Sequence, residues 1–86
     1  MSEARYRNKS NNFGWLEAQD KSTPAEALEM LAGDDDYFVR KAVAQNASAP
    51  PEALEKLAGD DAQWIRRAVA HHPSAPEELI YLLRKS

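Results

Sequence analysis

Apolar residues in the middle of the chain recur at intervals of three and four, the spacing typical of short amphipathic helices. The same spacing returns in a second segment of nearly identical sequence: VRKAVAQNASAP begins at Val39, and IRRAVAHHPSAP begins at Ile65. The two apolar sets are Phe38, Val39, Ala42 and Val43, and Trp64, Ile65, Ala68 and Val69. We predict a helix in each segment, with these residues on its buried face and with Phe38 and Trp64 filling the layers of the core.

A leucine stripe precedes each of these segments and returns once more near the C-terminus. Its members are Leu28 and Leu31, Leu54 and Leu57, and Leu79 and Leu82. Each stripe predicts one face of a further short helix. At the start of the first of these helices, Thr23 is predicted to be the N-cap and Pro24 the first helical residue.

The residues between the two kinds of helix are typical of helix ends. Gly33 and Gly59 follow the leucine stripes and are predicted to terminate those helices. Aspartates come next, and Asp35 or Asp36 in one copy and Asp61 in the other are predicted to cap the second helix. Each unit therefore reads as a pair of short helices.

The chain repeats itself at one fixed offset. Aligning 23–48 with 49–74 gives 15 identical positions out of 26. A third copy begins and stops halfway; it has one proline fewer, so we align Pro51 with Pro76 and Leu54 with Leu79. A repeat of this length predicts an all-α solenoid, because one helix pair cannot bury its own apolar stripe and must stack on the next.

The sequence divides into five parts by composition and repeat. We expect residues 1–10 to form a disordered tail, 11–22 an N-terminal cap, 23–48 and 49–74 two full repeats, and 75–86 half of a third repeat. Apolar residues cluster in 11–22 at Phe13, Trp15 and Leu16. A cap would cover the open end of the stack, and the alternative is that this segment docks onto another protein.

Composition narrows the class of function. The 86 residues carry 11 basic and 14 acidic side chains, a net charge of −3, which argues against general attraction to nucleic acid or anionic lipid. Cysteine is absent, so disulfides and thiolate metal sites are excluded. With no apolar run of the roughly 20 residues that a membrane helix needs, and no signal peptide in MSEARYRNKSNN, we expect a cytoplasmic protein.

Catalytic and metal-binding patterns find little support. The serines stand in predicted turns or near the termini without a G-x-S-x-G elbow, and the three glycines are far apart, so no phosphate-cradling loop is present. His71 and His72 are the only histidine cluster, and adjacent residues on a helix point about 100° apart, which does not suit a shared metal. We expect neither an enzyme nor a metal or cofactor site.

Two stretches carry a resemblance to a known family: Val39 to Asn46, VRKAVAQN, and Pro51 to Ala58, PEALEKLA. They resemble the leucine-rich repeat variant, a relative of HEAT and armadillo repeats. The resemblance covers residues 23–86 and implies a right-handed stack of two and a half helix pairs that serves surface recognition rather than chemistry. Some members carry an iron–sulfur cluster in a cysteine-rich segment, which a chain without cysteine cannot hold.

The resemblance also implies a structural role for two Asp and Arg pairs six residues apart. HEAT-like repeats commonly form an Asp–Arg ladder within or between units. The corresponding residues here are Asp34 and Arg40 in the first repeat, and Asp60 and Arg66 in the second. We expect this structural ladder rather than a ligand site.

The helical wheel points a different set of side chains away from the core. With Val39 inward, Tyr37, Lys41, Ala44 and Gln45 point outward, and Gln63, Arg67, Ala70 and His71 do so in the next repeat. In HEAT-like stacks the second helices line the concave side. We predict that Tyr37, Lys41, Gln63, Arg67 and His71 bind a protein partner that carries acidic groups.

Other functions remain open at this stage. A solvated face with no partner explains the same charges. A nucleic-acid-binding HEAT-like module would show steep salt dependence. A self-assembling structural protein would associate through its open end near Leu79, Tyr81 and Leu82, helped by the contrast between acidic first helices and more basic second helices.

Overall fold

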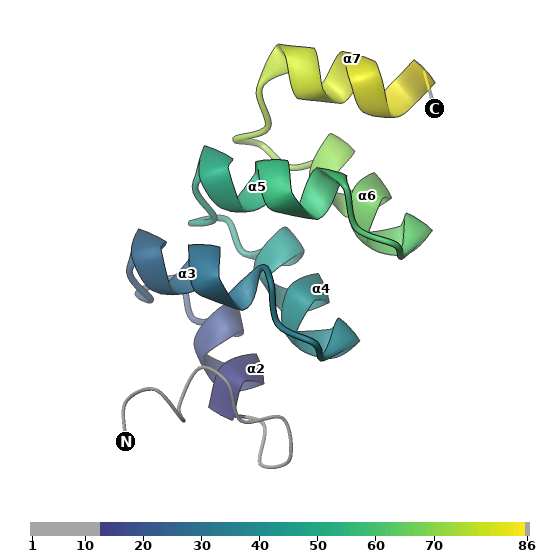
Figure 1. Cartoon of the computed structure of the whole chain (residues 1–86). Coiled ribbons are helices and arrows are strands. Elements are labelled where there is room, and N and C mark those ends of the chain that lie inside the picture. Colours follow the sequence, from purple (N-terminus) through teal and green to yellow (C-terminus); the bar gives the residue numbers. More distant parts are fainter. Residues whose placement is uncertain (1–12, 86) are drawn as a thin grey trace.

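The computed structural model describes residues 13–85, and this part of the chain is entirely helical, with six helices and no strand (Figure 1). The helices are α2 (Phe13–Gln19), α3 (Ala25–Leu31), α4 (Tyr37–Gln45), α5 (Pro51–Ala58), α6 (Gln63–Ala70) and α7 (Glu77–Lys85). The all-α prediction is confirmed for these residues. The tail predicted for residues 1–10 lies outside them.

The helices form two layers that run side by side along an elongated molecule of 41 × 23 × 14 Å. One layer holds α3, α5 and α7, and the other holds α2, α4 and α6 (Figure 1). Each helix packs against its neighbours within its own layer and against the other layer. Consecutive helices alternate between the layers, as stacked helix pairs must do to bury a shared apolar seam.

The structural repeat has the same length in all three copies. The first layer's helices begin at Ala25, Pro51 and Glu77, and the three equivalent amides donate to the three equivalent proline carbonyls. These bonds run from Leu28 to Pro24, from Leu54 to Pro50 and from Ile80 to Pro76. Aligning Leu54 with Leu79 was therefore wrong. The proline that the third copy lacks is the one at the first helical position, where another residue serves equally well.

Two of the predicted caps are wrong and one is confirmed. Thr23 does not cap α3; its buried hydroxyl donates to the carbonyl of Glu17 at 2.6 Å, and Pro24 stands at the N-cap. Asp36 caps α4 by accepting a hydrogen bond from the amide of Phe38 at 2.9 Å. The N-cap of α6 is Ala62 rather than Asp61, because the second repeat has alanine where the first has Asp36.

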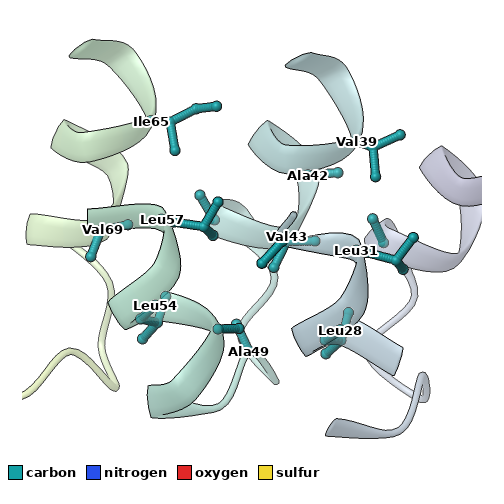
Figure 2. Packing of buried hydrophobic residues seen from close by; sticks show 14 residues of the cluster. Leu28, Leu31, Val39, Ala42, Val43, Ala49, Leu54, Leu57, Ile65 and Val69 are labelled. Atoms are coloured by element: carbon teal, nitrogen blue, oxygen red, sulfur yellow. The ribbon is translucent and has the colours of Figure 1, made fainter. Parts of the chain in front are cut away.

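The core lies between the two layers and is built from branched aliphatic side chains (Figure 2). Its eight largest fully buried members are Leu28, Leu31, Leu54, Leu57, Ile65, Val39, Val43 and Val69. Burying one such side chain contributes about 1.5–3 kcal/mol. The first two leucine stripes thus face the valine and isoleucine stripes across the layers, and equivalent residues meet in successive repeats. The third stripe differs from the prediction: Leu79 is only partly buried and Leu82 is 61% exposed.

Phe38 and Trp64 do not fill the core as predicted. Their exposed fractions are 60% and 48%, whereas Ala44, predicted to point outward, is 2% exposed. The reason is that α4 has a neighbour on each side within its layer as well as helices opposite. The buried arc of α4 therefore extends past Val43 to Ala44, and the side that carries Phe38 faces solvent.

Hydrogen bonds from Asn46 and His72 join successive turns on one edge of the stack. Asn46 donates through Nδ2 to the carbonyls of Ala18 at 2.7 Å and Asp20 at 3.1 Å. His72 is the equivalent residue of the next repeat, and its Nε2 lies 2.7 Å from the carbonyl oxygen of Asn46. Its Nδ1 accepts from the amide of Ser74, so Nε2 is the nitrogen that carries the proton and donates.

The helix α2 takes the place of a second-layer helix before the first repeat. It packs against α4 and α3, and Ala18 is fully buried there. Asp20 stands at the position that Asn46 and His72 occupy in the two repeats, and its carboxylate likewise accepts from the amide two residues on, that of Ser22. Residues 13–22 therefore follow the geometry of the second half of a repeat, although little of the sequence resembles one.

Replacing Asn46 should loosen α2 more than the rest of the fold. Asn46→Ala leaves two carbonyls without their donor and removes the acceptor for the amide of Ser48. A cost of about 1–3 kcal/mol in the free energy of unfolding is expected. Urea denaturation measures that cost, and hydrogen exchange should show the α2 amides losing protection first.

The matched control is Gln45→Ala, because Gln45 is the exposed neighbour on the same helix. Its effect should stay within about 0.5 kcal/mol. Equal stability of the two variants would contradict a joining role for Asn46.

Candidate functional site

An ion pair between Arg40 and Asp60 joins the two full repeats. The Nε of Arg40 lies 2.7 Å from Oδ2 of Asp60, and the exposed fractions of the two side chains are 19% and 6%. The Nη1 of Arg40 donates to the carbonyls of Asp34 and Asp35, both at 2.9 Å. One guanidinium therefore ties the turn of its own repeat to the carboxylate of the next.

The carboxylate of Asp60 also organises its own turn. Its Oδ1 accepts a hydrogen bond from the amide of Ala62 at 2.9 Å, just before α6 begins. The hydrogen bond to Asp60 raises the pKa of Arg40 above its ordinary value, and burial of the guanidinium opposes that effect. Because the pKa is raised, any stabilisation that follows from the shift is present throughout the neutral range and disappears only in strong alkali.

Arg66 repeats half of this arrangement. Its Nη1 donates to the carbonyls of Asp60 at 2.6 Å and Asp61 at 3.0 Å, as Arg40 does in its own repeat. Within residues 13–85, no carboxylate forms a salt bridge with its Nε edge. Asp34 contributes its backbone carbonyl to Arg40, while its carboxylate accepts from the amide of Asp36. Of the four ladder residues, only Arg40 and Asp60 meet through their charges.

The five residues predicted to bind a partner lie in two different environments. Tyr37 and Lys41 are half-buried at the contact between repeats: Tyr37 packs against the core, and Nζ of Lys41 lies 5.3 Å from the ring centre of Trp64. The other three, Gln63, Arg67 and His71, are exposed on α6. The structure thus separates the set. The helix α6 packs against one side of α4, whereas no further second-layer helix within residues 13–85 packs against the equivalent side of α6.

Two exposed aromatic side chains complete the outer side of the second layer. Phe38 and Trp64 occupy equivalent positions of the two repeats, and Lys41 and Arg67 follow three residues later on the same helices. We call these four residues the aromatic face. The helical wheel could have predicted this exposure, because Phe38 lies about 140° from Val43 on it. The hydrophobicity of Phe38 led us to place its side chain inward.

A groove of about 670 Å³ lies between α6 and the neighbouring ends of α5 and α7. We call it the terminal groove; its lining residues are Ala58, Gln63, Arg66, Arg67, Ala70, His71, Leu83 and Arg84. Three of them are arginines, and no aspartate or glutamate belongs to the lining. Arg84 was not predicted as a site residue, because no spacing rule in the sequence brings α7 beside α6.

The described residues contain no cluster of metal-ligating side chains. Among residues 13–85, no group of three or more His, Asp or Glu side chains could hold a metal ion. None of the helices within the same residues is long and apolar enough to cross a membrane.

Comparing alanine variants of Arg40 and Arg66 measures how much the Arg40–Asp60 ion pair contributes to the free energy of unfolding. Arg40→Ala removes the counter-charge from a carboxylate that is 6% exposed, and we expect a loss of about 2–3 kcal/mol in the free energy of unfolding. Arg66→Ala loses an equivalent pair of backbone hydrogen bonds but no salt bridge among the described residues, and should cost about 1 kcal/mol. Denaturant titration of both variants checks the difference, and equal losses would refute a role for the ion pair.

Comparison with known proteins identifies the repeat. Residues 37–62 match the family model described as leucine rich repeat variant, whereas no curated protein and no solved structure matches the chain. The matched segment spans α4, α5 and the turn before α6, and it ends just before Gln63, the equivalent of Tyr37, so it covers one full period of the repeat. The resemblance seen in the sequence is thereby confirmed for residues 37–62.

Proposed function

We propose that the chain is a small, non-catalytic helical-repeat module that binds a protein partner through the aromatic face. The single observation that carries this proposal is the exposure of Phe38 and Trp64 at equivalent positions of both repeats, each followed by a cation. Large aromatic side chains gathered on an exposed surface are typical of interaction sites. Trp and Arg are also enriched among the residues that dominate binding energy.

The local contacts of the aromatic face favour docking without rearrangement. Lys41 lies over the ring of Trp64, and Tyr37 meets Phe38 edge to face at a centroid distance of 5.2 Å. Each exposed ring is therefore held by a neighbour from the same layer. Pre-ordered side chains lose less entropy on binding than free ones, so the surface is suited to recognition.

The charges of the aromatic face favour a partner with acidic groups. Lys41 and Arg67 are its charged members, and both can form charge-assisted hydrogen bonds to carboxylates. Nucleic acid also offers anions and bases that stack on aromatic rings. The net charge of −3 argues for a protein instead, because phosphate binding depends on a surplus of cations.

The proposed scaffold for this face is a short right-handed α-solenoid of two and a half repeats, with residues 11–22 as its N-terminal cap. Support comes from the two-layer packing, the constant offset between equivalent helices and the contact of α2 with α4. In this arrangement α2 covers one end of the core. The leucine rich repeat variant match supports the helical-repeat character of the module.

Truncating the two aromatic side chains should abolish partner binding and spare the fold. The double variant Phe38→Ala/Trp64→Ala removes side chains that are 60% and 48% exposed, so the helical circular dichroism should be unchanged. Affinity capture from native lysate with the wild-type chain should retain a specific protein. We expect the amount of that protein captured by the variant to fall at least about tenfold, since each hot-spot aromatic residue contributes more than 1 kcal/mol to binding.

The matched control is Met30→Ala/Leu82→Ala, which truncates two exposed apolar side chains on the first layer. It should capture the protein as the wild type does. Equal capture by the wild type, the aromatic double variant and this control would refute the proposal that the aromatic face binds the partner. Capture that disappears on nuclease treatment would favour nucleic acid instead.

A further inference from the structure

We propose that the terminal groove binds a partner helix that begins in an aspartate turn, with the aspartate carboxylate paired to Arg66. This binding site goes beyond the aromatic face, with which the groove shares only Arg67. The inference rests on two observations: the molecule already contains one such docking arrangement between α4 and α6, and the terminal groove carries the equivalent receiving residues.

The internal arrangement shows which side of a second-layer helix receives the next one. Arg40 on α4 takes the carboxylate of Asp60, Lys41 lies over Trp64, and Ala44 is buried to 2% exposure. The segment that docks there consists of an aspartate turn followed directly by α6. Asp60 serves both parts. Its two oxygens accept from Nε and Nη2 of Arg40 at 2.7 and 3.4 Å, and Oδ1 also accepts from the amide of Ala62.

The equivalent side of α6 lines the terminal groove. Arg66, Arg67 and Ala70 occupy the positions of Arg40, Lys41 and Ala44 in the next repeat, and all three belong to its lining. The groove is bordered on its other side by Leu83 and Arg84 of α7, which lies beside α6 at the end of the stack (Figure 1). A helix placed here would contact α6 and α7 as α6 itself contacts α4 and α5.

Arg66 is held in advance for a carboxylate. Its two hydrogen bonds to the carbonyls of Asp60 and Asp61 match those of Arg40 to Asp34 and Asp35. They fix Nη1 and leave the Nε edge, which in Arg40 binds the carboxylate, without a salt bridge among residues 13–85. A preorganised guanidinium loses little further entropy when a carboxylate binds, and the paired geometry is specific.

The rest of the lining defines the chemistry of the occupant. Arg67 and Arg84 add two cations, whereas Ala58, Ala70 and Leu83 supply small or apolar contacts. An amphipathic helix with a narrow apolar side and acidic residues at its start fits both properties. A basic helix does not fit, because it would bring like charges against three arginines. A uniformly polar helix would leave Ala58, Ala70 and Leu83 without an apolar partner.

The probe for this site can be taken from the chain itself. A synthetic peptide with the sequence of residues 59–72 reproduces the segment that docks on α4, and replacing its two arginines with glutamine removes cations that would oppose the groove. The peptide is titrated into the full ¹⁵N-labelled chain and followed by NMR. We expect saturable shifts of the Arg66 Nε–H signal and of the α6 and α7 amides, while the Arg40 Nε–H signal stays in place.

The carboxylate is tested on the peptide, where a substitution cannot disturb the fold of the protein. Changing the peptide's aspartate at position 60 to asparagine should weaken binding about tenfold, the effect of losing a charge-assisted bidentate pair. In the chain, Arg66→Lys should abolish that difference between the two peptides. Lys21→Gln removes one exposed cation far from the groove and should preserve the difference.

Several results would overturn the inference. They are a peptide that produces no saturable shift, one that binds equally well with asparagine, and one whose shifts lie outside α6 and α7. If the Arg66 signal shifts when the concentration of the chain alone is raised, the occupant of the groove is a second copy of the chain and not a partner helix. Phe38→Ala should leave the titration unchanged, so failure of the aromatic face and failure of the terminal groove are separable.

Discussion

The whole arrangement depends on one constraint: a pair of helices seven to nine residues long cannot bury its own apolar stripe. Leu54 and Leu57 are fully buried only because the valines of α4 and α6 close over them. Helices this short are also marginal in isolation, so packing between neighbours supplies most of their stability. Each helix from α3 to α6 therefore packs against the helix before it and the helix after it.

Polar contacts set the register of this stacking. The apolar seam would tolerate small sliding motions, since one leucine resembles the next. The Arg40–Asp60 ion pair and the hydrogen bonds of Asn46 and His72 connect residues 20 to 28 positions apart in the sequence, and each needs a particular offset between repeats. They lie on different turns of the repeat, so together they fix both the translation and the orientation of each unit against the next.

Stacking also explains why equivalent residues have different roles. Lys41 and Arg67 are equivalent in sequence, yet Lys41 lies at the contact between repeats and Arg67 is exposed in the terminal groove. Arg40 and Arg66 differ in the same way, since among residues 13–85 only the first pairs with an aspartate of the following turn. The second repeat thus exposes residues whose equivalents in the first repeat hold the two repeats together, and this difference is the physical basis of the proposed terminal groove.

The sequence by itself determined the helical class, the period of the repeat, the leucine and valine core and the family resemblance, because these depend on spacing within a single repeat. Only the tertiary structure decided that Phe38 and Trp64 are exposed, that Ala44 is buried, and that Arg66 and Arg84 share a groove. A helical wheel assumes one buried side, whereas α4 has neighbours on both sides of its own layer and in the layer opposite. Which side of a repeat stays open depends on its place in the stack, and no pattern within one repeat encodes that place.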